Sequence, residues 1–165
     1  MISAEFLMRV AIWLALLGYL AGELGRLAWR AGHVLPWQKC RWASTVGCAF
    51  YILHVALAFD AVHHWSHSRA YQFTATQTEE AFGLYWGGGL FVNYLFTAIW
   101  LTELAAWWLA TSQYQQRRRW IDTLVRAFFA FLILNGAVVF VVGPVRWLGI
   151  GLVVALGFGF YRYRP

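Results

Sequence analysis

Four long apolar runs constrain this chain more than any other feature of its sequence. A helix needs about 20 predominantly apolar residues to cross the roughly 30 Å hydrocarbon core of a bilayer. Each run has close to that length, and a shorter, glycine-rich fifth run follows them. The sequence therefore predicts an all-α fold, a polytopic membrane helix bundle that forms a single integral membrane domain over residues 1–165. The expected helices cover residues 6–25, 43–62, 90–110, 123–142 and 147–161.

The composition agrees with a membrane protein. Charged residues make up 12% and hydrophobic residues 61% of the chain, whereas a soluble domain has about 25% charged and 45–50% apolar residues. A net charge of +6 would suggest nucleic acid as the partner of a soluble protein. In this chain, however, the basic residues lie between apolar runs, where they orient helices in a bilayer. We therefore expect the lipid bilayer as the environment and no nucleic-acid partner.

The basic residues also predict how the helices are oriented. They cluster after the first, third and fifth runs, whereas the long loop at residues 63–89 and the last short loop contain only Arg69 and Arg146. Cytoplasmic loops carry an excess of Lys and Arg. Five spans place every cluster in the cytoplasm, whereas four would leave Arg162 and Arg164 outside. We therefore expect about five transmembrane helices, the fifth short, with the N-terminus outside and the C-terminus cytoplasmic, in the bacterial inner membrane.

Two pairs of oppositely charged residues lie at matching depths in these runs. Ionisable side chains at membrane depth usually have partners. Glu103 and Arg126 lie near the cytoplasmic ends of neighbouring runs, and Arg9 and Asp60 lie near the outer ends of the first two. We predict a structural ion pair in each case. The alternative for Glu103 is a proton-carrying or substrate-binding role.

The stretch DAVHHWSH, at the outer end of the second run, contains metal-ligand residue types at helical spacing. If the second helix continued through it, Asp60, His64 and His67 would share one face, and His63 and His67 would be one turn apart. Two or three imidazoles with one carboxylate suit Zn, Cu or non-haem Fe. One hypothesis is therefore a metal site formed by these four residues. The alternative is that the histidines contact lipid headgroups or a partner subunit.

His54 lies within the apolar part of the second run, in FYILHVALAF. A bis-histidine haem site would need a second histidine at similar depth on another helix, and the sequence has none. One interpretation is a single axial ligand to a haem or a chlorophyll-type pigment. The other is a hydrogen bond to Asn135 or to another polar residue on a neighbouring helix.

Small residues offer a separate signal for helix packing. Gly18 and Gly22 have the GxxxG spacing that allows membrane helices to approach closely.

No nucleotide-binding glycine loop or nucleophile elbow occurs, so an enzyme is not favoured. The small size and the aromatic-rich apolar surfaces favour an accessory subunit of a larger membrane complex, of respiratory or photosynthetic type, packed against other integral membrane subunits. The alternatives are a metal-binding or redox membrane protein that uses the histidine cluster, and a pigment- or haem-binding subunit that uses His54.

Overall fold

The computed structural model describes residues 3–33, 37–140 and 145–162, and within these ranges the chain is helical, with no strand. Four helices are long and apolar enough to cross a membrane, namely α1, α2, α4 and the helix that α6 and η1 form together. The expectation of an all-helical protein with membrane-spanning helices is therefore confirmed. The elements are α1 (Ala4–Arg30), α2 (Trp37–Ala61), α3 (His67–Phe82), α4 (Gly89–Leu109), α5 (Thr111–Gln116), α6 (Arg119–Leu134), η1 (Asn135–Val139) and α7 (Val145–Arg162).

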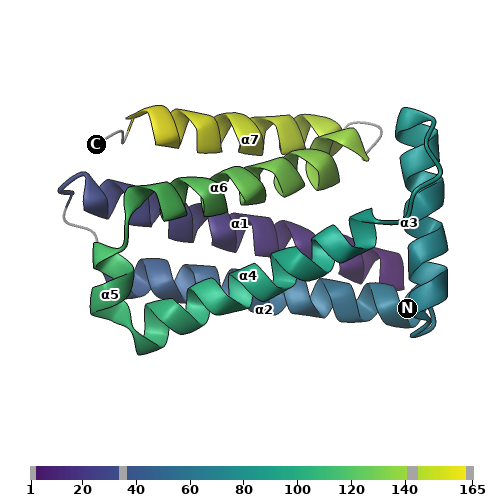
Figure 1. Ribbon diagram of the computed structural model, residues 1–165, viewed down its shortest axis with the longest axis horizontal. Helices are drawn as coiled ribbons and strands as arrows, with labels where there is room; N and C mark the ends of the chain where they lie inside the picture. Colours follow the sequence, from purple (N-terminus) through teal and green to yellow (C-terminus); the bar gives the residue numbers. More distant parts are fainter. Residues whose placement is uncertain (1–2, 34–36, 141–144, 163–165) are drawn as a thin grey trace.

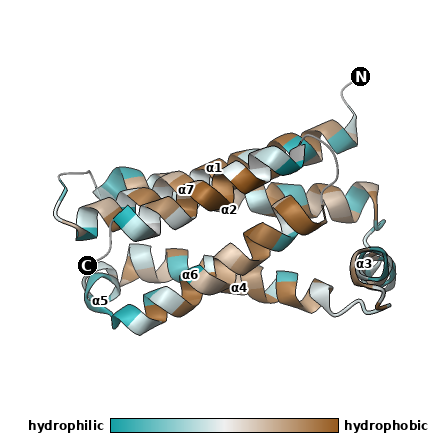
Figure 2. Cartoon of the chain, turned by 90° about the horizontal axis from the view of Figure 1, so that it is seen from above, coloured by the Kyte–Doolittle hydropathy of each residue, from teal (hydrophilic) through white to brown (hydrophobic). Residues whose placement is uncertain are grey.

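The long helices run alongside one another, and short elements lie at the two ends of the bundle. Figure 1 shows α3 lying across one end of the long helices and α5 lying at the other end. We call these the α3 end and the α5 end. The helix α1 begins at the α3 end, and α7 finishes at the α5 end. Hydrophilic residues gather at α3 and α5, whereas the long helices between them are largely hydrophobic (Figure 2).

The long helices carry large apolar side chains on their outward faces. About half of the surface of Leu17, Leu53, Leu101 and Phe131 is exposed, on α1, α2, α4 and α6 respectively. A soluble monomer rarely exposes apolar surface on all its helices, because each such patch favours association. Lipid solvates these side chains at no such cost, so the outward faces suit immersion in a bilayer.

The helices α1 and α2 approach each other through glycines. A Cβ atom added to Gly18 would lie 2.6 Å from the Cα atom of Gly47, and one added to Gly22 would lie 2.9 Å from the Cβ atom of Ser44. Such distances leave no room for a side chain between the two backbones. The close approach expected from the spacing of Gly18 and Gly22 is therefore confirmed.

Aromatic rings from four helices fill the centre of the bundle. The ring of Phe129 on α6 stacks 5.0 Å from that of Tyr19 on α1 and lies 4.5 Å from that of Phe96 on α4. Trp100 on α4 and Tyr51 on α2 complete the group, with ring centroids 5.5 Å apart. Aromatic pairs in such geometries add about 0.5–1.5 kcal/mol beyond the area they bury. This core holds α1, α2, α4 and α6 together next to the site described below.

The helix α6 changes from α to π geometry at Asn135, where the sequence has an Asn-Gly pair in mid-span. The Asn135 amide donates a hydrogen bond to the Phe131 carbonyl at 2.7 Å, which supports the wider turn. A Cβ atom on Gly149 of α7 would overlap the Ala137 carbonyl. The π turn is therefore also the place where the backbones of η1 and α7 meet.

Candidate functional site, a buried network of arginines and carboxylates

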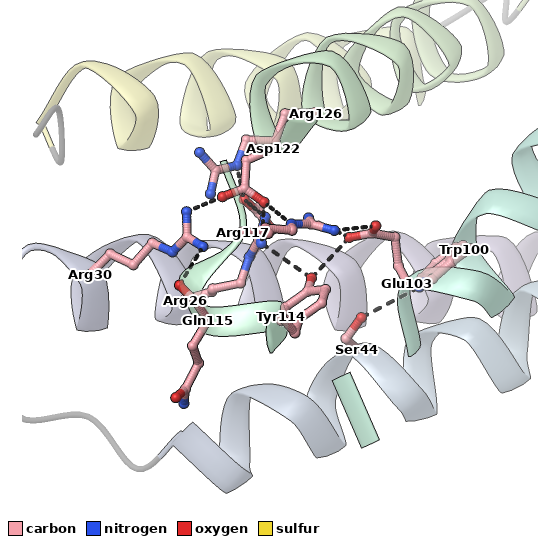
Figure 3. A network of polar contacts seen from close by, with 11 residues as sticks. Arg26, Arg30, Ser44, Trp100, Glu103, Tyr114, Gln115, Arg117, Asp122 and Arg126 are labelled. Carbon is pink, nitrogen blue, oxygen red and sulfur yellow. Dashed lines mark hydrogen bonds and ion pairs between the residues drawn. The ribbon is translucent and has the colours of Figure 1, made fainter. Parts of the chain in front are cut away.

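Charged side chains gather near the α5 end, where α1, α4, α5 and α6 meet (Figure 3). The group combines four arginines, three carboxylates and one tyrosine, and we call it the ion-pair network. Its members are Glu23, Arg26 and Arg30 of α1, Glu103 of α4, Tyr114 of α5, Arg117 of the α5–α6 connection, and Asp122 and Arg126 of α6.

Asp122 is the central acceptor of the network and is only 1% exposed. Its Oδ1 atom accepts hydrogen bonds from Arg26 Nη1 at 3.1 Å and from Arg117 Nε at 2.5 Å, and its Oδ2 atom pairs with Arg30. Two of these three arginines belong to α1, so the carboxylate attaches the end of α1 to the beginning of α6. Hydrogen bonds between ionised groups are roughly twice as strong as neutral ones.

Glu23 joins the same two helices one turn deeper in α1. It accepts two hydrogen bonds from Arg26, from Nε and Nη2, each at 3.0 Å, and one from Arg126 Nε at 2.5 Å. The paired bonds from Arg26 match the planar fork of a guanidinium to both oxygens of a carboxylate. Arg26, itself 1% exposed, thus contacts both Glu23 and Asp122.

Glu103 brings α4 into the network. Both of its oxygens accept from Arg117, at 2.5 and 2.7 Å, and Oε2 also accepts from the Tyr114 hydroxyl at 2.9 Å. Burial raises the pKa of Tyr114, so its hydroxyl stays protonated and donates. Burial lowers the pKa of Arg117, but its hydrogen bonds to Glu103 and the charges around it outweigh this effect and leave the pKa raised. Arg117 therefore remains a cation between Glu103 and Asp122.

The network holds one more arginine than it has carboxylates. Arg30 is the most exposed of the four, with 22% of its side chain accessible, and it also donates to the Gln115 carbonyl at 3.4 Å. The extra positive charge therefore lies at the edge of the network nearest to water, where its solvation costs least.

A small cavity of about 20 Å³ adjoins the network. Its walls include Glu23, Glu103 and Arg126 together with the aromatic side chains of Tyr19 and Trp100. A buried water needs roughly 10–15 Å³ by this measure and two to four polar partners. The cavity therefore has room for about one water molecule and is too small for an organic substrate.

The ion-pair partners of Glu103 and Arg126 differ from the expected pairing. Glu103 pairs with Arg117, and Arg126 pairs with Glu23. Matching depth along two helices does not fix the direction in which each side chain points. The short helix α5 folds the connection back, which brings Arg117 to Glu103, while Arg126 faces α1.

Arg9 and Asp60 also have other partners than the expected one. Arg9 lies 4.0 Å from Glu5, one turn earlier in the same helix, and both side chains are more than 70% exposed. Asp60 accepts a hydrogen bond from Trp65 Nε1 at 3.1 Å. Each residue thus interacts with a residue four or five positions away in the sequence. Side chains about one helical turn apart are already neighbours.

Six network members were not anticipated as site residues, namely Glu23, Arg26, Arg30, Tyr114, Arg117 and Asp122. A signal for two of them exists in the sequence. Glu23 interrupts an apolar run and has Arg26 three residues later, a spacing at which helical side chains are neighbours. Asp122 stands at the start of a run, where its depth is ambiguous. Tyr114 carries no signal, because tyrosine is common at membrane boundaries.

The histidine cluster does not form the expected metal site, because α2 ends at Ala61. His64 and Trp65 then adopt positive φ angles of 48° and 56°, and α3 begins at His67. The helical spacing that would have placed Asp60, His64 and His67 on one face, and His63 one turn from His67, is thereby lost. Within residues 3–33, 37–140 and 145–162, no three His, Cys, Asp or Glu side chains lie together as a metal site.

Two of these histidines take part in aromatic packing at the α3 end. The ring of His63 lies 5.4 Å from that of Phe59 and 5.3 Å from that of Phe73, so it joins α2 to α3. His67 Nδ1 forms a hydrogen bond with the Tyr94 hydroxyl at 3.0 Å, which joins α3 to α4. These contacts position α3 across the end of the bundle.

The packing of His63 predicts a pH dependence of stability. Burial, with a smaller contribution from His64, lowers the pKa of His63 below its ordinary value. The unfolded chain then binds more protons than the folded one, so stability falls as the pH drops below about 6.5. We expect His63→Gln to reduce the difference in unfolding temperature between pH 7.5 and pH 5.5. His33→Gln, at the other end of the bundle, is the control, and an equal reduction there would contradict this role of His63.

His54 forms its hydrogen bond with the backbone of α1. Its Nδ1 atom lies 3.0 Å from the Met8 carbonyl, and since a carbonyl only accepts, Nδ1 carries the proton. Asn135, the partner expected from the sequence, bonds to the Phe131 carbonyl of its own helix.

Comparisons of the chain with protein-family models, with curated proteins and with solved structures find no match.

Proposed function

We propose that this chain is an accessory subunit of a larger membrane complex, of respiratory or photosynthetic type, and that it packs against other integral membrane subunits without being an enzyme. The observation that carries this proposal is the ion-pair network. Each of its carboxylates, on Glu23, Glu103 and Asp122, is bound by an arginine from outside its own helix. Such a network fixes the shape of the bundle, as a subunit that presents a constant surface to its neighbours requires.

The surroundings of Glu103 argue against a role in proton transfer or substrate binding. Three donors from Arg117 and Tyr114 occupy its two oxygens. A proton could bind only by displacing one of them, and the adjoining cavity has room for about one water molecule. A structural role for Glu103 is therefore the better supported one.

The topology belongs to the same proposal, with five spans, the N-terminus outside, the C-terminus cytoplasmic, and the bacterial inner membrane as the location. The helix α7 has 18 residues, about 27 Å at the rise of an α-helix, and runs alongside α6 (Figure 1). This length is close to the hydrocarbon thickness. With five spans, the basic α5 end faces the cytoplasm and α3 lies on the outer surface.

Cysteine labelling tests this topology, because Ser68 and Ser112 are exposed at opposite ends and the native Cys40 and Cys48 are buried. In intact cells, a membrane-impermeant maleimide is expected to label Ser68→Cys and to leave Ser112→Cys unlabelled until the cells are lysed. The reverse pattern would invert the topology.

The accessory role is tested in native membranes. A chain tagged and extracted in mild detergent is expected to migrate with a fixed ratio of other membrane proteins, well above its own 18.9 kDa. Photoreactive residues replace Leu53, Leu101, Phe131 and Val154, each on the outward face of a different helix. We expect one crosslinked protein from adjacent positions and only lipid from the others. Lipid adducts from all four positions, with a chain that migrates alone, would rule out the proposal.

A second candidate function is favoured by the hydrogen bond of His54. A histidine that binds a metal usually donates its other ring N–H to a carbonyl or carboxylate, and Nδ1 of His54 does so to Met8. Nε2 would then be the ligand to a haem or chlorophyll-type pigment held between this chain and a partner. An absorption band of such a pigment in the native complex that is lost in His54→Leu supports this function. Its absence from the wild-type complex excludes it.

A further inference from the structure

A groove of about 370 Å³ lies between the carboxyl-terminal halves of α1 and α7. Small residues on both helices form its walls, chiefly Gly25 and Ala28 of α1 and Ala155 and Gly159 of α7. Its volume falls in the range of roughly 300–1,000 Å³ that is typical of ligand sites. None of the residues that line the groove belongs to the ion-pair network.

The groove is apolar along its length and has a single charge at one end. Phe158 and Val154 of α7 are 65% and 62% exposed, so this side of α7 is an uncovered apolar surface. Arg162, about one turn after Gly159, contributes to the groove at the α5 end. Among the described residues, Arg162 forms no ion pair with a carboxylate. The groove is therefore apolar along its length and positively charged at one end, which matches the apolar acyl chain and the negatively charged headgroup of an anionic lipid.

We propose that this groove binds one acyl chain of an anionic phospholipid, with the headgroup phosphate paired to Arg162. Arginine suits this role because its planar fork can donate two hydrogen bonds to one phosphate. Basic pockets between helices at the membrane boundary recognise anionic headgroups in this way. The small side chains of Ala28 and Ala155 allow the acyl chain to lie against both helices.

Native mass spectrometry of the purified full chain tests the proposal, with phosphatidylglycerol and phosphatidylcholine as the added lipids. The wild type is expected to retain one phosphatidylglycerol with about fivefold preference over phosphatidylcholine, since one basic residue near the headgroups contributes about that factor. Arg162→Gln is expected to abolish the preference. Arg118→Gln, which removes another exposed arginine at the same end, is the matched control and is expected to keep it.

A second pair of variants tests the groove itself. Ala155→Leu is expected to fill it and to prevent retention of both lipids. Gly157→Leu, on the same helix, adds its side chain where nothing lies within 4 Å, and is expected to retain lipid as the wild type does. Retention of phosphatidylglycerol by Ala155→Leu at the wild-type level would overturn the proposal.

The Arg162→Gln variant tests the proposal even if Ala155→Leu does not fold, because Arg162 is exposed and its substitution leaves the helix packing unchanged. An unchanged lipid preference in Arg162→Gln overturns the proposal. Inorganic phosphate at millimolar concentration is expected not to displace phosphatidylglycerol; displacement would show that phosphate alone is recognised. The assay uses the isolated chain, so its outcome does not depend on whether the chain belongs to a larger complex.

Discussion

Asp122→Asn is expected to lower the free energy of unfolding by about 3–5 kcal/mol, the range measured when one partner of a buried ion pair is removed. The substitution keeps the shape of the side chain but removes the charge that faces Arg26, Arg30 and Arg117. Three guanidinium groups then lie near one another without their common counter-charge, and the new amide points a donor at other donors. Reversible unfolding of the chain in detergent micelles, followed by circular dichroism, measures the loss.

Glu5→Gln is the control for this prediction. It removes the carboxylate of the Arg9–Glu5 pair, whose side chains are 75% and 78% exposed, and exposed pairs contribute about 0–1 kcal/mol. The double variant Asp122→Asn/Arg117→Gln is expected to lose less stability than the sum of its single variants, because the second substitution removes one of the stranded charges. An effect of Asp122→Asn no larger than that of Glu5→Gln would show that the network does not hold α1 to α6.

Hydropathy was sufficient to predict the four long helices that could span a membrane. A segment in lipid must pair its backbone polar groups within itself, and a helix does so. The spacing of Gly18 and Gly22 predicted a close helix contact, since only small residues let two backbones approach. These features depend on local sequence, which explains why they could be anticipated.

The partners of the charged residues could not be anticipated in the same way. Depth along a helix follows from counting residues, but the direction of a side chain depends on how each helix is rotated. Arg126 pairs with Glu23 of α1, and Glu103 pairs with Arg117, although Arg126 and Glu103 lie at matching depths. The six-residue helix α5 lies between the predicted helices 90–110 and 123–142, outside both, and it returns Arg117 to Glu103.

The histidine cluster failed as a prediction for a related reason. The hypothesis required α2 to continue beyond Ala61, and nothing in DAVHHWSH resembles a glycine stop signal. The chain turns at His64 and Trp65 with positive φ angles, which residues other than glycine adopt uncommonly. Packing of His63 between Phe59 and Phe73, and of α3 across the end of the bundle, selects this turn.

Gly18→Val is expected to lower the free energy of unfolding by about 3 kcal/mol, at the upper end of the usual cost of overpacking. The added Cβ atom would lie 2.6 Å from Gly47 Cα and 2.8 Å from the Ala43 carbonyl oxygen. Both contacts are with backbone, so no side-chain rotation relieves them, and α1 and α2 must move apart. Gly157→Val is the control, because the same change on α7 meets open space. Equal stability of the two variants in the same unfolding assay would contradict close packing at Gly18.

Gly47→Val provides the reciprocal test, since its Cβ atom would lie 2.9 Å from the Ala15 carbonyl oxygen on the opposite face of the same contact. If Gly18 and Gly47 act as one contact, the first valine already separates the helices. The double variant Gly18→Val/Gly47→Val should then lose clearly less stability than the sum of the two single variants. If the stability losses of the two single variants added fully, Gly18 and Gly47 would belong to separate contacts. Sub-additivity would establish that α1 is held to α2 by backbone contact at Gly18 and Gly47.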